Sequence, residues 1–189
     1  MTKLVGITGG IGSGKTTFSK HLKKLGYFVH ESDVVVSDIY TKPKKQFLSF
    51  VKKKISQHAV NKNKINKVEI ANVVFSNNTI KKLLEKYIHK EVQNSRKAFI
   101  KKYTKKKKKL IFADIPLLFE NKLEKNFDSV ICIISSKKNR IKRVLKNKKF
   151  TKENLNKIFK AQTTDKERKK RSQIIINNNK TKKDFIFSV

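Results

Sequence analysis

Four glycines, a lysine and two threonines near the start of the chain form the pattern with the clearest chemistry. Residues 9–16, GGIGSGKT, match the spacing G-x-x-x-x-G-K-[ST] of a phosphate-binding loop. Glycines open backbone conformations in which successive N–H groups converge on the phosphates of a nucleotide. Lys15 would contact the β and γ phosphates, Thr16 would offer its hydroxyl to Mg²⁺, and Thr17 would contact the α phosphate. The residues expected to bind the nucleotide are Gly9, Gly10, Ile11, Gly12, Ser13, Gly14, Lys15, Thr16 and Thr17.

Two carboxylates follow apolar, strand-like runs and are the candidates for acid–base and metal chemistry. Asp33 comes just after the second run, and Asp114 ends the third. Ligands of a doubly wound sheet lie at the carboxyl ends of its strands, so both carboxylates are expected at the phosphate edge. Asp33 would accept a proton from an acceptor hydroxyl, or it would cap the helix that follows. Asp114 would assist Mg²⁺ binding next to Thr16, or it would be an ordinary polar strand end.

The elements around these residues predict an α/β fold. Residues 3–8 form an apolar run, apolar residues recur at helical spacing over 15–25, and residues 27–30 resume strand character. Strand, helix and strand in that order make a βαβ unit with parallel strands. Further strands are expected at 110–120, 129–134 and 174–177.

Between these strands the pattern changes to helices in two places. Residues 34–104 carry four helical patterns and are expected to form a helical insertion. A strongly basic segment at about 137–171 contains Arg140, Arg143, Arg168 and Arg171, and it would close over the phosphates as a lid. Arginines there would neutralise the charge that develops on a transferred phosphoryl group.

Composition bounds the class of protein. Forty-eight Lys and Arg against 14 Asp and Glu give a net charge of +34, which favours anionic ligands. Because the excess is scattered lysine, drift in composition explains it better than a nucleic-acid surface. The single cysteine, Cys132, lies in an apolar run and indicates a buried thiol in a reducing compartment. The chain shows no apolar run long enough for a membrane helix, so we expect a cytoplasmic protein with no membrane partner.

Several functions remain open on the residues alone. A GTPase is disfavoured because the chain has neither D-x-x-G nor N-K-x-D. A small-molecule or nucleoside kinase fits better, with the acceptor determined by the helical insertion. A nucleic-acid-binding ATPase is the alternative that the charge suggests, and a regulatory protein that binds ATP without transfer is a third.

Several segments together make the chain resemble the dephospho-CoA kinase family. They are GITGGIGSGKT at 6–16, ESD at 31–33, IPLLFE at 115–120, RIKRVL at 140–145 and KAQTTDKERKKRSQIIINN at 160–178. The resemblance covers nearly the whole chain. It implies a three-layer P-loop NTPase fold with a parallel sheet, with residues 1–33 and 105–189 as the nucleotide-binding core and 34–104 as a helical acceptor-binding subdomain.

The resemblance also implies a reaction and roles for particular residues. The γ-phosphate of ATP would pass to the ribose 3′-hydroxyl of dephospho-CoA, which is the last step of coenzyme A synthesis, and no specific nucleic acid would bind. Asp33 matches the general base, Arg143 matches a lid arginine, Asn178 matches an Asn near the adenine, and His89 matches a His of the acceptor domain.

The chain departs from the family pattern at a few positions. Glu31 stands where the family has Asp, Lys90 where it has Pro, and Asn147 where it has a second lid arginine. Ser172 and Gln173 replace an Ala-Asp pair. None of these positions falls in the phosphate-binding loop, so the departures bear on the lid and the acceptor and leave the predicted ATP site intact.

Overall fold

The computed structural model describes residues 1–146 and 150–187, and its chain divides into two compact units. Unit 1 comprises Met1–Glu31 and Phe99–Val189, and unit 2 comprises Ser32–Ala98. Asn147 lies outside the described residues. No helix among the described residues is long and apolar enough to cross a membrane.

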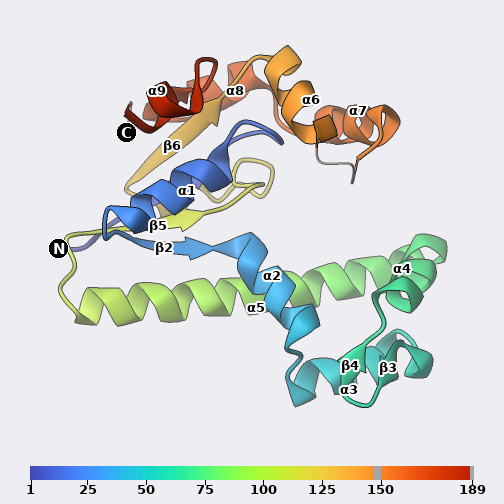
Figure 1. The fold of residues 1–189 in the computed structure, drawn as a ribbon. Coiled ribbons are helices and arrows are strands. Elements are labelled where there is room, and N and C mark those ends of the chain that lie inside the picture. Colours follow the sequence, from blue (N-terminus) through green and yellow to red (C-terminus); the bar gives the residue numbers. More distant parts are fainter. Residues whose placement is uncertain (147–149, 188–189) are drawn as a thin grey trace. The chain divides into compact units, whose positions relative to one another are not determined.

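Unit 1 is built on a parallel sheet of five strands, as the apolar runs predict (Figure 1). The strand order is β2-β5-β1-β6-β7, so the strand that leads into the glycine loop is central. Parallel pairing places the carboxyl ends of all five strands along one edge. The strands are β1 (Lys3–Thr8), β2 (Phe28–Glu31), β5 (Leu110–Asp114), β6 (Ser129–Ile134) and β7 (Ile174–Asn177).

Both faces of the central strands are buried, which explains their uninterrupted apolar sequences. On one face, Val5 and Ile7 of β1 pack with Phe18 and Leu22 from the first helix. The opposite face has a second apolar cluster, in which Leu118 and Phe119 pack with residues of β5 and β6. A sheet covered on both faces holds its strand ends rigidly, which suits a site built at those ends.

The helices of unit 1 flank this sheet. They are α1 (Lys15–Lys24), α6 (Lys137–Lys146), α7 (Lys152–Ala161), α8 (Asp165–Lys170) and α9 (Lys182–Phe187). The strand expected over 110–120 is shorter than predicted and ends at Asp114. Pro116 has no N–H to give to a sheet, and the chain turns through residues 116–122 instead.

Unit 2 is mainly helical and has its own core. Its helices are α2 (Ser32–Thr41), α3 (Lys45–Lys54), α4 (Lys67–Ser76) and α5 (Asn78–Lys105), the last of which continues into unit 1. Phe47 and Val51 of α3 pack with Leu84 and Ile88 of α5. A short hairpin, β3 (Val60–Asn61) and β4 (Lys64–Ile65), was not predicted, because two-residue strands carry no recognisable periodicity.

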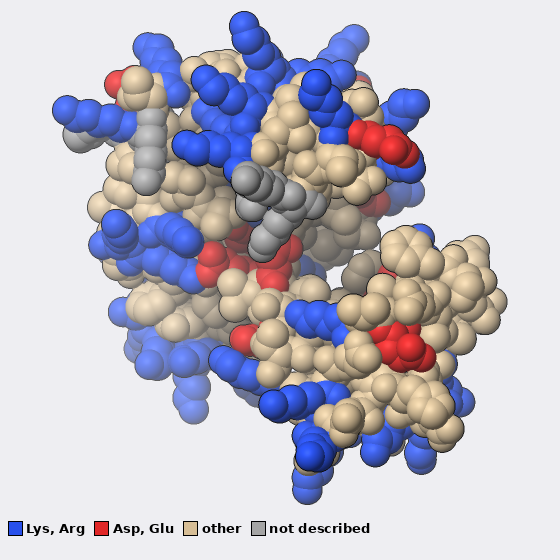
Figure 2. Space-filling view, turned by 45° about the vertical axis from the view of Figure 1, so that its right-hand side comes forward, with Lys and Arg blue, Asp and Glu red and all other residues tan. Residues whose placement is uncertain are grey.

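Positive charge is widely distributed over the surface. Figure 2 shows Lys and Arg side chains scattered over the visible face, with acidic side chains between them. A surface that binds nucleic acid is expected to carry one basic stripe. On the visible face the Lys and Arg side chains do not form such a stripe.

Candidate functional site

The glycine-rich loop joins β1 to α1 at the carboxyl edge of the sheet. Gly12 and Gly14 have φ angles of 75° and 105°, a region that residues with a side chain rarely adopt. At Gly14 a Cβ atom would also lie 2.1 Å from Nδ2 of Asn178, so both conformation and space require glycine there. Ser13 Oγ is buried and has no hydrogen-bond partner in the described parts of the chain. Glycines that permit this backbone and a buried hydroxyl without a partner among the described residues fit a bound phosphate chain.

Lys15 and Asp114 meet at the start of α1. The Lys15 ammonium forms an ion pair with the Asp114 carboxylate, and both side chains are largely buried. Ser19, one helical turn after Lys15, donates to the other oxygen of the same carboxylate at 2.7 Å. The predicted carboxylate at the end of β5 therefore holds the lysine of the loop in place.

The residues present fit Mg²⁺ only in company with a nucleotide. Thr16 is exposed in the first turn of α1. Among the described residues, no three His, Cys, Asp or Glu side chains form a metal-binding group. Mg²⁺ in phosphoryl-transfer sites is commonly held by one or two protein groups together with substrate phosphates and waters.

Asn178 and Arg143 hold the loop from the side of β7 and α6. Asn178 follows β7, is buried, and donates from Nδ2 to the Ser13 carbonyl at 2.7 Å. Arg143 on α6 donates from Nη2 to the main-chain carbonyl of Asn178 at 2.9 Å and from Nη1 to the Gly12 carbonyl at 3.4 Å. It also donates to the hydroxyl of Ser135 at 3.1 Å. These two sequence-predicted residues are thus brought together on the backbone of the loop.

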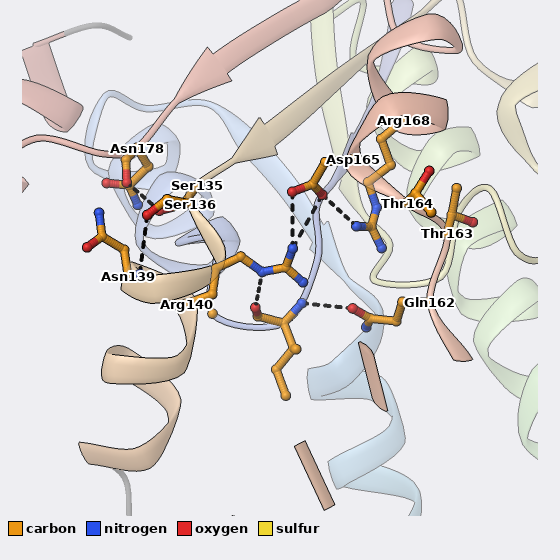
Figure 3. Close-up of polar contacts among 12 residues, drawn as sticks. Ser135, Ser136, Asn139, Arg140, Gln162, Thr163, Thr164, Asp165, Arg168 and Asn178 are labelled. Atoms are coloured by element: carbon orange, nitrogen blue, oxygen red, sulfur yellow. Dashed lines mark hydrogen bonds and ion pairs between the residues drawn. The ribbon is translucent and has the colours of Figure 1, made fainter. Parts of the chain in front are cut away.

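A second set of residues from the basic segment, which includes Arg140 and Gln162 (Figure 3), meets the tip of the loop at Ile11. Arg140 on α6 donates from Nε to the Ile11 carbonyl at 2.8 Å. The Ile11 amide donates to Oε1 of Gln162, just after α7, at 3.0 Å. The backbone carbonyl and the backbone amide of Ile11 are therefore both bonded to side chains of the basic segment.

Asp165 joins two arginines beside this tip. It accepts from Nη1 of Arg140 at 3.2 Å and from Nη1 of Arg168 at 2.9 Å, and Arg168 also pairs with Glu120 at 3.4 Å. Burial lowers the pKa of Arg140, and the charge of Asp165 acts in the opposite direction. The pairing keeps two like charges together in a largely buried place.

Asp33 lies in the first turn of α2, two residues after β2 ends at Glu31. The helix was expected to begin at Val34, with Asp33 as a possible cap, but it begins at Ser32. Asp33 is therefore inside the helix rather than before it, where a carboxylate also interacts favourably with the helix dipole. Its side chain is exposed.

Unit 2 contains a cavity of about 450 Å³. It is lined by Val35, Asp38, Ile39, Lys42, Lys44, Phe47, Tyr87, Glu91, Asn94, Ser95 and Ala98. The residues from α5 lie at helical spacing on one face of that helix. His89 is exposed and is not among the lining residues.

Several site residues were not singled out from the sequence. Gln162, Asp165 and Ser19 are ordinary polar residues, and no local pattern marks which of many such residues face the loop. Ser19 had a usable signal, because it lies four residues after Lys15 and so shares its helix face. Gln162 and Asp165 had none, since their position depends on how the basic segment folds back onto the loop.

Comparison with known sequences points to one family. The profile of the family described as dephospho-CoA kinase matches residues 3–184. A dephospho-CoA kinase from Fusobacterium nucleatum is 33% identical over 188 residues, covering 98% of this chain and 94% of the relative. One from Buchnera aphidicola is 36% identical over 187 residues, covering 95% and 85%.

Comparison with solved structures gives the same result. A dephospho-CoA kinase from Campylobacter jejuni superposes with a TM-score of 0.74 at 25% identity, covering 99% of this chain and 93% of that one. A structure from Thermus thermophilus gives a TM-score of 0.78 at 26% identity, covering 97% and 92%. A shikimate kinase from Acinetobacter baumannii, at 13% identity and a TM-score of 0.50, shares the fold alone.

Proposed function

The chain belongs to the dephospho-CoA kinase family, and from that premise we propose how its own residues phosphorylate dephospho-CoA to give coenzyme A. In this proposal ATP lies on the glycine-rich loop, and its γ-phosphoryl group passes to the ribose 3′-hydroxyl of dephospho-CoA. The observation that carries the proposal is the loop itself. Its glycines, the buried Ser13 hydroxyl, which has no partner among the described residues, and the buried pair of Lys15 and Asp114 make a site for a phosphate chain at the end of β1.

Thr16 and Asp114 are the residues that would help to hold Mg²⁺, together with the phosphates of the nucleotide. When bound, the ion neutralises charge on the β and γ phosphates. Lys15 adds a fixed positive charge to the same oxygens, and Asp114 and Ser19 hold it in place. Chelation by EDTA should abolish turnover, and added Mg²⁺ should restore it.

Asp33 is the proposed base for the acceptor hydroxyl. The acceptor oxygen forms a bond to the γ phosphorus, the bond from that phosphorus to the β–γ bridging oxygen breaks, and ADP leaves with the bond's electrons. The hydroxyl proton passes to the Asp33 carboxylate and from there to solvent. Because a carboxylate is a far weaker base than the alkoxide of a sugar, Asp33 acts chiefly by orienting the oxygen while the proton leaves late.

The lid contributes through the loop. Arg143 matches the lid arginine of the resemblance, and its guanidinium bonds to Gly12 and Asn178. We assign it the role of holding the loop backbone in the shape that receives the phosphates. Asn178 acts in the same way through Ser13 and would also border the adenine.

The cavity of unit 2 is the proposed place for the part of the acceptor that does not react. Its volume suits part of a ligand of this size, and Lys42 and Lys44 offer charge for a diphosphate next to the apolar surfaces of Phe47 and Tyr87. Replacing both lysines by Gln should raise the KM for dephospho-CoA and leave the KM for ATP unchanged. His89 on α5 is a separate candidate for acceptor binding, outside this lining.

The test of the proposed function is an ADP-release assay with ATP, Mg²⁺ and dephospho-CoA, comparing wild type with Asp33→Asn. We expect turnover to fall by about 100-fold or more while ATP affinity is retained, because a positioned proton acceptor contributes about 10²–10⁴ in rate. Glu85→Gln, an exposed carboxylate of α5 outside the cavity lining, is the matched control and should leave turnover unchanged. Equal turnover in Asp33→Asn and wild type would contradict the role of Asp33.

A further inference from the structure

The guanidinium group of Arg140 lies directly against the phosphate-binding loop. A Cβ atom on Gly10 would be 2.2 Å from Nη2 of Arg140 and 2.6 Å from its Cζ. The group is anchored there by the bond from Nε to the Ile11 carbonyl, and Gln162 holds the amide of the same residue (Figure 3). The guanidinium group of Arg140 is therefore held against the loop.

Arg140 keeps one of its three nitrogen atoms uncommitted. Nε bonds to Ile11 and Nη1 bonds to Asp165, whereas Nη2 forms no hydrogen bond with any residue that the structure describes. In Arg143, by contrast, both terminal nitrogens are bonded, to Gly12, Ser135 and Asn178. Of these two arginines on α6, only Arg140 has a terminal nitrogen, Nη2, that forms no hydrogen bond with the described residues, and this nitrogen lies against Gly10 of the loop.

Asp165 and Arg168 explain how this arrangement is maintained. Asp165 bridges the two guanidinium groups, so that Arg140 and Arg168 lie side by side in spite of their like charge. Arg168 Nη1 would be 2.9 Å from a Cβ atom on Gly10, so a second cation borders the same point of the loop. Its Nε is buried with no partner in the described ranges 1–146 and 150–187. Unused donors on buried cations beside a phosphate loop indicate an anionic ligand that contributes the missing acceptors.

We propose that Arg140 is a catalytic residue that contacts the γ-phosphoryl group as it transfers, acting as an arginine finger supplied by the same chain, and that Asp165 is its positioning residue. The proposal rests on the proposed function. The transferring group carries its charge on three equatorial oxygens and on the leaving β–γ bridging oxygen, and no proton moves to or from Arg140. A planar, permanently charged fork that is anchored before the reaction stabilises that charge without reorganisation.

The experiment compares affinity for a ground state with affinity for a transition-state mimic. Mg-ADP and Mg-ADP with aluminium fluoride are titrated onto wild type, Arg140→Gln, Arg140→Lys and Asp165→Asn, and kcat is measured with dephospho-CoA. For Arg140→Gln we expect kcat to fall about 100- to 1000-fold, ADP affinity to change by less than about threefold, and preference for the aluminium fluoride complex to fall with kcat. The kcat of Arg140→Lys should exceed that of Arg140→Gln by less than about tenfold, because lysine lacks the planar fork of the guanidinium group. Asp165→Asn should lower the same preference about tenfold, since it loosens the fork without removing it.

Lys142→Gln removes one exposed positive charge from the same helix and should match wild type in every measurement. The proposal is overturned if Arg140→Gln loses ADP and ADP–aluminium fluoride affinity in equal proportion, because Arg140 is then only a clamp on the loop. If Arg140→Gln does not fold, the double variant Arg140→Gln/Asp165→Asn removes the ion pair as a whole. The ratio of its affinities for ADP–aluminium fluoride and for ADP then decides in the same way. A wild type that fails on dephospho-CoA but prefers ADP–aluminium fluoride through Arg140 refutes the proposed function and leaves this proposal standing.

Discussion

Asn178 ties the end of β7 to the phosphate-binding loop, and its replacement by Ala should lower stability measurably. The change removes the bond from Nδ2 to Ser13 at 2.7 Å and the contact of Oδ1 with Arg143 Nη2 at 3.2 Å. Arg143 keeps its shorter bond to the main-chain carbonyl of Asn178, so only part of its interaction is lost. A lost neutral hydrogen bond, a weakened charged one and a buried carbonyl left without its donor add up to about 2–3 kcal/mol.

For a chain of this length, that free energy corresponds to a fall in Tm of about 4–12 °C. The assay is thermal unfolding followed by circular dichroism, without nucleotide and then with saturating Mg-ADP. The control is Asn177→Ala, the exposed neighbour, which should change the free energy of unfolding by less than about 0.5 kcal/mol. If Asn178→Ala unfolds at the same temperature as Asn177→Ala, the bond to Ser13 does not hold the loop and the reasoning is refuted.

Three further substitutions separate backbone strain, burial and charge. Gly26→Ala places a side chain at φ 85° with nothing within 4 Å of the new Cβ, so it should cost about 1–2 kcal/mol in unfolding experiments and leave kcat unchanged; a lower kcat would contradict this. Burial raises the pKa of Cys132 to about 11, so the native thiol keeps its proton where the unfolded one loses it. The free energy of unfolding should therefore fall between about pH 8.5 and pH 11 by more in wild type than in Cys132→Ala, and equal slopes in urea titrations would refute it. Asp114→Asn removes an ionic partner of Lys15 and should lower kcat about 10–100-fold, while unchanged kinetics would show that Lys15 does not need the Asp114 carboxylate.

The sequence predicts the fold of unit 1 because its signals are local and strong. Apolar runs such as SVICII are typical of strands buried on both faces, and glycines at fixed spacing before a lysine specify the loop that joins β1 to α1. Asp114 follows from the same logic, since it ends its strand at the edge of the sheet where the loop also lies. The strand was nevertheless predicted too long, because the apolar residues after Pro116 pack as a turn on the sheet rather than within it.

The contacts between the basic segment and the loop could not be predicted in the same way. Gln162 meets Ile11 across 151 positions of sequence, and Arg140 meets Asp165 through the folding back of α7 and α8. Such contacts depend on tertiary geometry, which side-chain type and spacing do not encode. Arginines of the basic segment were expected near the phosphates, but only the hydrogen bonds distinguish Arg143, whose two terminal nitrogens are both bonded, from Arg140, whose Nη2 forms no hydrogen bond with the described residues.

The most direct test of the central claim identifies the product of the reaction. The protein is incubated with ATP carrying ¹⁸O on its γ phosphate, Mg²⁺ and dephospho-CoA, and the products are separated and analysed by mass spectrometry and ³¹P NMR. We predict one new phosphate monoester on the ribose 3′-oxygen that carries the label, formed in equal amount to ADP and absent with adenosine or nucleoside monophosphates as acceptors. Release of ADP with labelled inorganic phosphate alone, or transfer of the label to another acceptor, would contradict the account.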